Sequence, residues 1–468
     1  MADFSLVIGG ESVSTDATFP VINPATGEAF AECPDCSQAQ LDVAMNAARD
    51  AFRPWAADEA ARRAALVAAA DALTPHAEAI GTILTREQGK PLKDAIGEVH
   101  GAAFWLRHTA GLEIPSEHLH EDDETRIELR RRPLGVVAAI TPWNFPIILS
   151  MWKIASGLLA GNTIVLKPSP FTPLSSLEMG RVMQEALPPG VLNVVSGGDD
   201  LGKWVSEHPA VRKISFTGSV ATGKKIAAVA APDLKRVTLE LGGNDPAIIL
   251  GDVDPSAIAE KLFWGAMNNA GQICIAVKRV YAEEKVYQPI VDALAEIARD
   301  VVVGDGMSPE TAMGPINNRP QFERVNELIE SARHDGAKFV AGGEPDERPG
   351  YFVRPTIVTG LEDGTRLVDE EQFGPVLPII PVRSAEDALE RANATHFGLG
   401  GSVWTNDVDR GVALASQLEC GTGWVNQHGA LSPFAPFGGS KWSGIGYENG
   451  PWGLAAFTEL QVLSIAKS

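Results

Sequence analysis

Residues 135–168 read GVVAAITPWNFPIILSMWKIASGLLAGNTIVLKP: a short apolar run, a helix-like segment and a second apolar run rich in β-branched residues. The same alternation continues to about residue 242 through VLNVVSG, KISFTG and RVTLELGG, with helical segments between them. Short β-branched runs that alternate with helices are typical of a parallel sheet covered on both faces. This stretch therefore predicts a doubly wound α/β domain.

The segments outside this domain follow other patterns. From residue 38 to 112, apolar residues recur at three and four positions, which predicts amphipathic helices. Residues 118–132 are charge-dense, and their second half alternates like an exposed hairpin strand. A second strand–helix alternation, from about 243 to 440, predicts a separate α/β domain. The tail after residue 455 alternates like a strand, whose partner is either the charged hairpin or a sheet edge of another subunit.

Composition limits the classes of partner and the compartment. The 468 residues carry a formal net charge of −21 that is spread along the chain, which argues against nucleic acid or anionic lipid as a partner. The first residues lack the features of a signal peptide, and there is no apolar run long enough to span a membrane. Four cysteines are too few for a disulfide scaffold of this size. We therefore expect a cytoplasmic protein.

Two stretches indicate a nucleotide site. KISFTGSVATGKKI, residues 213–226, places Gly218 and Gly223 in a turn between a strand and a helix, where backbone N–H groups and the helix dipole favour a phosphate. Lys167 ends another strand, at the sheet edge where such folds bind ligands. A purely structural turn and an exposed loop lysine are the alternative interpretations. Together the two stretches favour a nucleotide.

Three further residues are candidates for catalysis. Cys274 lies in NNAGQICIAVKRVY, Glu240 lies in an apolar strand before Gly-Gly, and Asn144 lies in the proline-fixed loop PWNFP. A thiol can act as a nucleophile, a buried carboxylate as a general base and an amide as an oxyanion donor. Taken alone, each has a simpler interpretation: a packed thiol, a solvent-facing glutamate and a turn asparagine. Their occurrence together favours a nucleophilic Cys274 that gains thiolate character from a helix N-terminus or a nearby cation.

The sequence favours no metal site. Cys33 and Cys36 form CPDC, but zinc needs four ligands and no second pair occurs. The motif is interpreted as a turn after an NPATGE strand. His118 and His120 lie in the charged hairpin, where we expect solvated side chains.

Eight motifs occur in the order and approximate spacing of one enzyme family. They are NPATGE (23–28), PWNFP (142–146), KPSPFTPL (167–174), FTGSVATG (216–223), LELGGN (239–244), GQIC (271–274), EEQFGPVLP (370–378) and PFGGSKWSGIG (436–446). On these motifs the chain resembles the aldehyde dehydrogenase superfamily of NAD(P)-dependent, non-phosphorylating enzymes over nearly its whole length.

The resemblance implies a fold and a mechanism. It implies a Rossmann-like dinucleotide-binding domain over 1–116 and 136–242, a catalytic domain over 243–442, and oligomerisation strands over 117–135 and 455–468 of a homodimer or homotetramer. Cys274 would attack the aldehyde, while the Asn144 amide and the Cys274 backbone N–H hold the oxyanion. Glu240 would activate the water that hydrolyses the thioester to a free carboxylic acid. Lys153 matches a lysine near the active site of family members.

NAD is the cofactor that the resemblance implies. It assigns Lys167 to the adenosine ribose, Ser219 to the pyrophosphate, and Glu371 with Phe373 to the nicotinamide side. The full predicted cofactor site comprises Ile140, Thr141, Trp143, Lys167, Ser169, Gly198, Phe216, Gly218, Ser219, Gly223, Leu241, Gly242, Glu371 and Phe373. Pro170 is a departure, since many NAD-preferring relatives carry there a glutamate that repels a 2′-phosphate. NADP therefore stays open as a second cofactor.

The implied substrate tunnel is mostly apolar. It comprises Phe145, Ile148, Leu149, Trp152, Ile273, Ile275 and Phe437, together with the loop 425–437. No arginine occurs among these positions, which favours an apolar or aromatic uncharged aldehyde over one that carries a carboxylate. Gln427 and His428 are candidates for a polar contact, with a solvent-facing loop histidine as the commoner case.

Three other functions compete with this interpretation. A CoA-acylating semialdehyde dehydrogenase generally lacks a glutamate at the position of Glu240. A cysteine-dependent hydrolase needs a histidine beside Cys274, and none lies in the motifs above. A non-enzymatic protein that kept the fold, as some lens crystallins have, would have no use for Cys274, Glu240 and Asn144 together.

Overall fold

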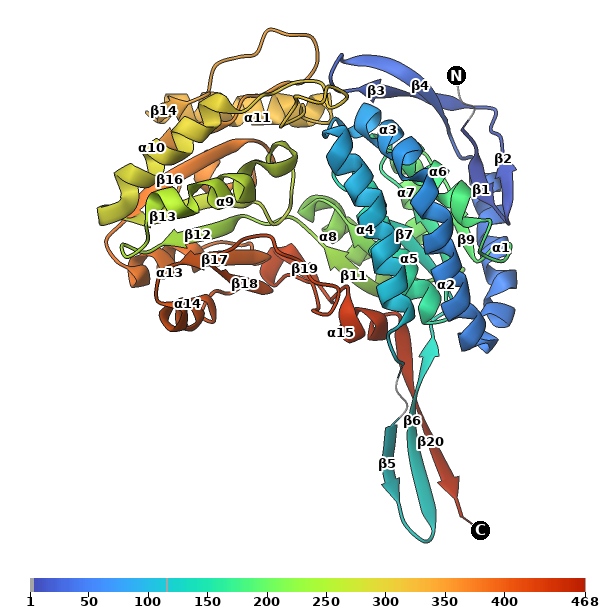
Figure 1. The fold of residues 1–468 in the computed structure, drawn as a ribbon. Coiled ribbons are helices and arrows are strands. Elements are labelled where there is room, and N and C mark those ends of the chain that lie inside the picture. The colour runs from blue at the N-terminus through green and yellow to red at the C-terminus, as the bar shows by residue number, and fades with distance from the viewer. Residues whose placement is uncertain (1–3, 115–116, 468) are drawn as a thin grey trace.

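The computed structural model describes residues 4–114 and 117–467, and its two large sheets form the two halves of the molecule (Figure 1). The first sheet has eight strands. In spatial order they are β19 (Gly444–Ile445), β11 (Arg236–Glu240), β10 (Val211–Thr217), β7 (Val136–Ile140), β8 (Thr163–Lys167), β9 (Leu192–Val194), β1 (Leu6–Ile8) and β2 (Glu11–Val13). The five strands from β11 to β9 run parallel, so their carboxyl ends share one edge.

Helices cover this sheet on both faces. They are α1 (Gln38–Ala57), α2 (Glu59–Leu73), η1 (Thr74–His76), α3 (Ala77–Gln88), α4 (Leu92–Ala110), α5 (Pro146–Leu159), α6 (Leu174–Met183), α7 (Asp199–Glu207) and α8 (Val220–Ala230). The chain moves from β7 to β9 through α5 and α6, and back through α7 and α8 to β11. Since such crossovers are right-handed, the two helix pairs lie on opposite faces. The predicted doubly wound α/β sheet is confirmed.

The second sheet has seven strands and is parallel except for its edge strand β14. In spatial order they are β14 (Lys338–Ala341), β15 (Thr356–Thr359), β16 (Val376–Val382), β13 (Val277–Glu283), β12 (Asp245–Ile249), β17 (Gly400–Trp404) and β18 (Thr422–Val425). Its helical elements are α9 (Pro255–Met267), η2 (Asn268–Gly271), α10 (Glu284–Asp300), α11 (Arg319–His334), α12 (Arg366–Asp369), α13 (Ala385–Asn393) and α14 (Val408–Ala415); η3 (Lys441–Ser443) and α15 (Gly450–Ala455) follow.

A three-stranded sheet projects from the first half of the molecule (Figure 1). It consists of β5 (Glu117–Glu121), β6 (Thr125–Pro133) and the C-terminal β20 (Thr458–Ala466). The tail strand therefore pairs with the charged hairpin, in an antiparallel register from Thr458 opposite Pro133 to Ala466 opposite Thr125. Within the described part of the chain, none of the helices combines the length and apolarity that a bilayer crossing requires.

The interpretation of NPATGE and CPDC was wrong in its local structure. NPATGE forms the turn between β3 (Thr18–Asn23) and β4 (Glu28–Pro34) rather than a strand. CPDC begins inside β4, and both of its thiols are buried. The alternation of FAECP was too short to separate the end of a strand from a turn.

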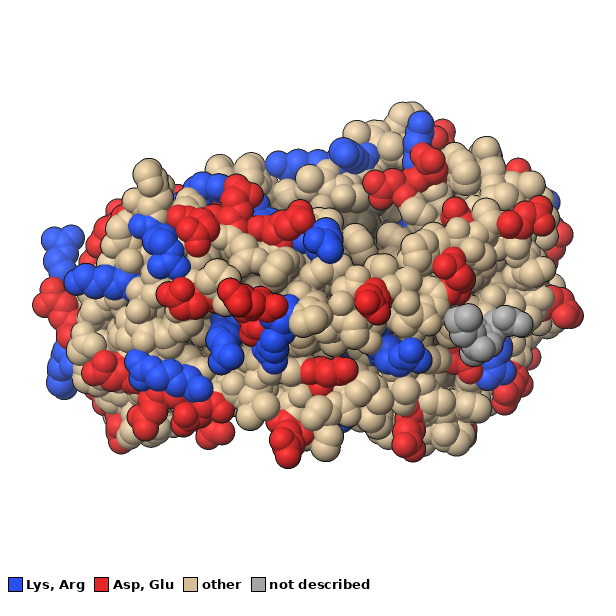
Figure 2. Space-filling view, turned by 90° about the horizontal axis from the view of Figure 1, so that it is seen from above, with Lys and Arg blue, Asp and Glu red and all other residues tan. Residues whose placement is uncertain are grey.

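Acidic and basic side chains alternate over the face shown in Figure 2, where Lys and Arg do not gather into a continuous patch. This distribution agrees with the net charge of −21. It gives this face no electrostatic footprint for a polyanion.

Candidate active site

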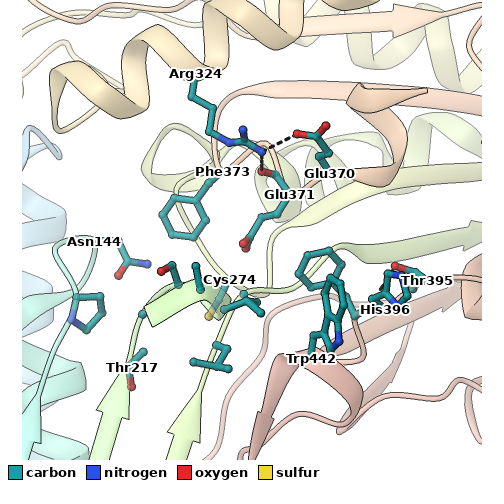
Figure 3. Close-up of a pocket in the computed structure, with 18 of the residues that line it drawn as sticks. Asn144, Thr217, Cys274, Arg324, Glu370, Glu371, Phe373, Thr395, His396 and Trp442 are labelled. Atoms are coloured by element: carbon teal, nitrogen blue, oxygen red, sulfur yellow. Dashed lines mark hydrogen bonds and ion pairs between the residues drawn. The ribbon is translucent and has the colours of Figure 1, made fainter. Parts of the chain in front are cut away.

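The candidate site lies between the two large sheets. Asn144, Gly218 and Glu240 follow or end strands of the first sheet, whereas Cys274 and Phe373 precede strands of the second. The carboxyl edge of one sheet therefore faces the amino edge of the other. A cavity of about 1000 Å³ opens between them, and Figure 3 shows Cys274 among side chains from both halves.

The cavity brings together half of the predicted cofactor residues. Trp143, Gly218, Ser219, Leu241, Gly242, Glu371 and Phe373 line it together with Asn144, Leu149 and Cys274. Ile140, Thr141, Lys167, Ser169, Gly198, Phe216 and Gly223 do not line it. In the second group, Gly223 lies in the first turn of α8, and the other residues lie at or after the carboxyl ends of β7 to β10. Sequence reasoning missed Gln321, Arg324, His396 and Trp442, which also line the cavity.

A strained turn presents Cys274 to the cavity. Asn269, Ala270 and Gly271 have left-handed φ values of 50°, 55° and 69°, a costly conformation for the two non-glycine residues. A Cβ on Gly271 would lie 2.3 Å from the Gly374 carbonyl oxygen. The glycine of GQIC therefore allows this turn to pack against the segment that carries Glu371.

The surroundings of Cys274 oppose ionisation of its thiol. Burial raises the pKa of the Cys274 thiol to about 12, and the carboxylates of Glu371, Asp245 and Glu240 add to the shift. Lys278 is the nearby cation and lowers the pKa, but desolvation is the larger effect. The nearby cation can be seen in the sequence, whereas the burial that opposes it cannot, and the thiolate character of Cys274 stays a prediction.

Asn144 is held beside the nucleophile with one amide hydrogen unused. Its Nδ2 donates to the Gln272 carbonyl oxygen at 2.9 Å, which leaves the second hydrogen of the NH₂ group for another acceptor. The Asn144 carbonyl oxygen accepts from Lys90 Nζ at 2.9 Å and from Asn269 Nδ2 at 3.2 Å. These bonds fix the PWNFP loop against the turn that precedes Cys274.

Glu240 ends β11 in a buried polar cluster. Burial raises the pKa of Glu240 well above its ordinary value, Glu448 raises it further and Lys153 opposes the shift. Neither carboxylate oxygen of Glu240 has a hydrogen-bond partner among the described residues. Lys153 Nζ donates to Glu448 and, at 2.7 Å, to Thr217 Oγ1, which borders the cavity. Sequence reasoning missed Glu448; a lone carboxylate in the glycine-rich GIGYENG was its only signal.

The features expected of a dinucleotide site are present. Ser219 caps the N-terminus of α8, where its side chain accepts from the Thr222 N–H. Glu371 accepts from the Gly243 N–H at 3.0 Å, and a Cβ on Gly242 would lie 2.1 Å from Glu371 Oε2. Trp143 and Phe373 meet edge to face at 5.2 Å between ring centroids. The N–H groups at the start of α8 suit a phosphate, and the aromatic side chains of the cavity suit the rings of a nucleotide.

The predicted tunnel residues form one apolar cluster with Cys274. Leu149, Trp152, Ile275 and Phe437 are buried in it, and Phe145, Ile148 and Ile273 pack against it. Trp105, Leu399 and Trp424 belong to the same cluster and were not predicted. Phe145, Ile148 and Trp105 also line a second cavity of about 380 Å³, whereas Cys274 lines the first. The apolar cluster thus reaches from the thiol to a second opening.

The interpretation of His428 as a solvent-facing loop residue was wrong. Its side chain is only 1% exposed. Its Nε2 lies 2.6 Å from the Ile275 carbonyl oxygen and its Nδ1 lies 2.9 Å from Ser402 Oγ. Both ring nitrogens are therefore in use, and neither is free to form a catalytic dyad with the Cys274 thiol.

Comparison with known proteins agrees with this geometry. Residues 12–463 match the model of the "Aldehyde dehydrogenase family". Retinaldehyde dehydrogenase 3 of Homo sapiens is 40% identical over 457 residues, which cover 96% of this chain and 89% of that protein. Phenylacetaldehyde dehydrogenase of Pseudomonas fluorescens is 39% identical, over an alignment that covers 98% of this chain and 95% of that protein. The NAD+ complex structure of an aldehyde dehydrogenase from Bacillus cereus superposes with a TM-score of 0.98 at 38% identity, covering 100% of this chain and 97% of that one.

Proposed function

Because the chain belongs to the aldehyde dehydrogenase family, we propose that it oxidises an aldehyde to the free carboxylic acid with NAD+ through a covalent intermediate on Cys274. The observation that carries the proposal is the cavity that Cys274 shares with Asn144, Ser219 and Glu371. A nucleophile and an amide donor stand there beside a helix N-terminus suited to phosphate.

The residues present fit the dinucleotide. The N-terminus of α8 offers N–H groups to the pyrophosphate. The Gly242 backbone lies so close to the Glu371 carboxylate that a Cβ there would collide with it, so this glycine lets Glu371 stand beside the cavity. Lys167 would bind the adenosine ribose, and Glu371 with Phe373 would hold the nicotinamide side. When bound, NAD+ accepts a hydride equivalent from the substrate carbon.

The protein's own residues supply the remaining chemistry. The Cys274 thiol gives up its proton to water, and the thiolate sulfur then bonds to the aldehyde carbon. The unused Asn144 amide hydrogen and the Cys274 N–H bind the resulting oxyanion. After oxidation, Glu240 removes a proton from the water that attacks the thioester. The C–S bond then breaks and the acid leaves. Lys153 and Glu448 tune the pKa of Glu240 from within the buried cluster.

The electrostatics beside Lys167 favour NAD+ over NADP+ although Pro170 replaces a glutamate. Burial lowers the pKa of the Lys167 ammonium to about 8. The negative charges of Asp199 and Asp35 oppose this shift most strongly. If Lys167 binds the adenosine ribose, the negative charge of these two carboxylates disfavours a 2′-phosphate there. Measurement of kcat/KM with both cofactors tests this preference.

A direct assay tests the function as a whole. Purified protein is mixed with NAD+ and each member of a panel of aliphatic, aromatic and acidic aldehydes, with and without CoA. We expect NADH and the free acid to form without CoA. A strict requirement for CoA would favour the acylating alternative, and no NADH with any aldehyde would refute the proposal.

We propose an aromatic, uncharged aldehyde as the substrate. The apolar cluster beside Cys274 contains three tryptophans, Trp105, Trp152 and Trp424, and Trp105 stacks on Trp152 at 5.9 Å between ring centroids. Aromatic pairs of this kind give favourable offset contacts to a further ring. The phenylacetaldehyde dehydrogenase that this chain resembles acts, by its name, on such an aldehyde.

Trp105→Ala is expected to lower kcat/KM for aromatic aldehydes by about 10- to 100-fold and that for short aliphatic ones by less, since the variant removes apolar contact from the tunnel wall. Steady-state kinetics with benzaldehyde, phenylacetaldehyde and propanal measure the difference. The control is Phe104→Ala, because Phe104 is the neighbouring aromatic but is 51% exposed. An equal loss for all three aldehydes would contradict aromatic selection by Trp105.

The reaction rate is expected to rise with pH. Burial raises the pKa of Cys274 to about 12 and also raises that of Glu240. Both groups act in their deprotonated forms, which a raised pKa shifts to the alkaline side. Initial rates at saturating substrates should therefore increase from about pH 6 to about pH 9. A rate that falls with pH over this interval, in protein that stays folded, would contradict these roles.

We further propose a homo-oligomer assembled through the three-stranded sheet. Leu119 on β5 and Leu460 and Val462 on β20 are 53%, 57% and 59% exposed, and the outer edge of β20 has no strand partner among the described residues. An exposed apolar edge strand of this kind readily pairs with a strand of another chain.

We retain 117–135 and 455–468 as oligomerisation strands, 1–116 with 136–242 as the dinucleotide-binding domain and 243–442 as the catalytic domain. The four free cysteines support the cytoplasm as the compartment.

A further inference from the structure

Two buried side chains bind the four consecutive carbonyl oxygens of residues 273–276, the turn that carries the nucleophile. Lys278 Nζ lies 2.8, 2.7 and 3.4 Å from the first, second and fourth of these oxygens. His428 Nε2 lies 2.6 Å from the third. The two side chains come from different elements, since Lys278 belongs to β13 and His428 to the loop after β18. Each carbonyl oxygen of residues 273–276 thus accepts a hydrogen bond from Lys278 or His428.

The surroundings of His428 fix its tautomer. Burial lowers the pKa of the imidazole to about 4, so the ring is neutral and its 3.8 Å approach to Asp245 is not an ion pair. A carbonyl oxygen can only accept, so Nε2 carries the proton. Nδ1 then accepts from Ser402 Oγ, which in turn accepts from Trp404 Nε1 at 3.0 Å. Trp424 packs against the ring at 4.8 Å between centroids.

The held carbonyls determine where the N–H groups of the turn point. In a trans peptide the C=O and the following N–H point in opposite directions. Lys278 therefore turns the N–H groups of Cys274 and Ile275 away from itself, and neither has an acceptor among the described residues. His428 holds the carbonyl of the peptide between Ile275 and Ala276. The N–H of that peptide, on Ala276, donates to the Ile273 carbonyl oxygen at 3.1 Å, and this oxygen belongs to the same peptide as the Cys274 N–H.

We propose that His428 is a positioning residue that, together with Lys278, keeps the Cys274 N–H directed at the oxyanion of the reacting aldehyde. The inference rests on the proposed function and assigns a role to a residue outside the motifs that suggested it. His428 touches neither the thiol nor the substrate; it acts through the Ile275 carbonyl.

Two substitutions of similar size separate this role from packing. His428→Gln keeps an N–H near the position of Nε2, whereas His428→Asn reaches only the position of Nδ1 and loses the bond to Ile275. We expect His428→Asn to lower the rate of the NADH burst and kcat by about 10- to 100-fold, because oxyanion stabilisation weakens. The KM for NAD+ should stay within about threefold, and His428→Gln should recover most of the rate.

Alkylation of Cys274 by iodoacetamide supplies the second readout. This displacement forms a C–S bond and releases iodide without building an oxyanion, so its rate in His428→Asn should stay within about threefold of the parent. Ser402→Ala, which frees the tautomer, should lose about three- to tenfold in burst rate and supplies the test if His428→Asn does not fold. His208→Asn is the control, because that half-buried histidine contacts Asp42 at 3.3 Å and does not line the cavity.

Three outcomes would overturn the inference: equal activity of His428→Asn and His428→Gln, alkylation that falls in parallel with kcat, or an unchanged burst in folded Ser402→Ala. Failure of the proposed function is distinguishable from these, since the parent protein would then form no NADH with any aldehyde.

Discussion

Cys274→Ala is expected to abolish NADH formation, with a loss of about 10⁴-fold or more. The side chain carries the sulfur that must bond to the aldehyde carbon, and alanine offers no substitute nucleophile. NAD+ binding should stay within about threefold, since Cys274 is only one of the many residues that line the cavity. Stopped-flow absorbance of NADH and equilibrium titration of NAD+ measure the two quantities.

Cys420→Ala is the matched control for this variant. Cys420 is also a half-buried free thiol whose pKa burial raises to about 12, but it lies outside the cavity of Cys274. Its Sγ donates to the Thr422 carbonyl oxygen at 3.3 Å, and its side chain packs against an apolar cluster of the second half of the molecule. The control should keep its activity. If Cys274→Ala turned over normally, the covalent mechanism would be wrong, and loss of NAD+ binding would instead show a structural role.

The sequence was sufficient for the parts of the fold that depend on local pattern. The run from residue 135 to 168 alternates strand, helix and strand, and the structure places β7, α5 and β8 there. Parallel strands are buried on both faces, so their apolar runs are visible without knowledge of their neighbours. Asn144, Gly218 and Glu240 lie in motifs at the carboxyl ends of strands, where a strand and the turn after it are contiguous in the chain.

What the sequence did not predict depends on contacts between distant segments. Glu448 meets Lys153 across 295 positions, and His428 reaches Ile275 across 153. No local periodicity encodes such pairs, because each partner looks like an ordinary polar residue in its own segment. The surroundings of Cys274 follow the same rule: its basic neighbour Lys278 is visible in the sequence, while the burial that raises the pKa of the thiol is not.

Glu371, which lines the cavity, and Glu240, which does not, differ in their hydrogen bonds. Glu371 accepts a hydrogen bond from the Gly243 N–H, whereas the Glu240 oxygens lack partners among the described residues. A buried carboxyl without donors favours its neutral form, and it becomes a strong base once it is ionised. Glu240 therefore matches the later, hydrolytic stage better than the binding of the cofactor.

Glu240→Gln is expected to give a burst of NADH of about one equivalent per active subunit, followed by turnover slowed by about 10²- to 10⁴-fold. Glutamine has nearly the same shape and breaks no hydrogen bond of the Glu240 oxygens within the described residues, so the thioester should still form. Its hydrolysis loses the general base. Quenched-flow mass spectrometry should detect the acyl group on Cys274, and the slow steady rate should rise with pH as hydroxide replaces the activated water.

Glu178→Gln is the control for the loss of one carboxylate, because Glu178 pairs with Arg181 on α6 and does not line the cavity. It should retain both the burst and the steady rate. Equal loss of the two phases in Glu240→Gln would place Glu240 before hydride transfer, as a base for the Cys274 thiol. A lost steady rate with an intact burst would place the proton transfer from water at Glu240, which its burial next to Glu448 and Lys153 favours.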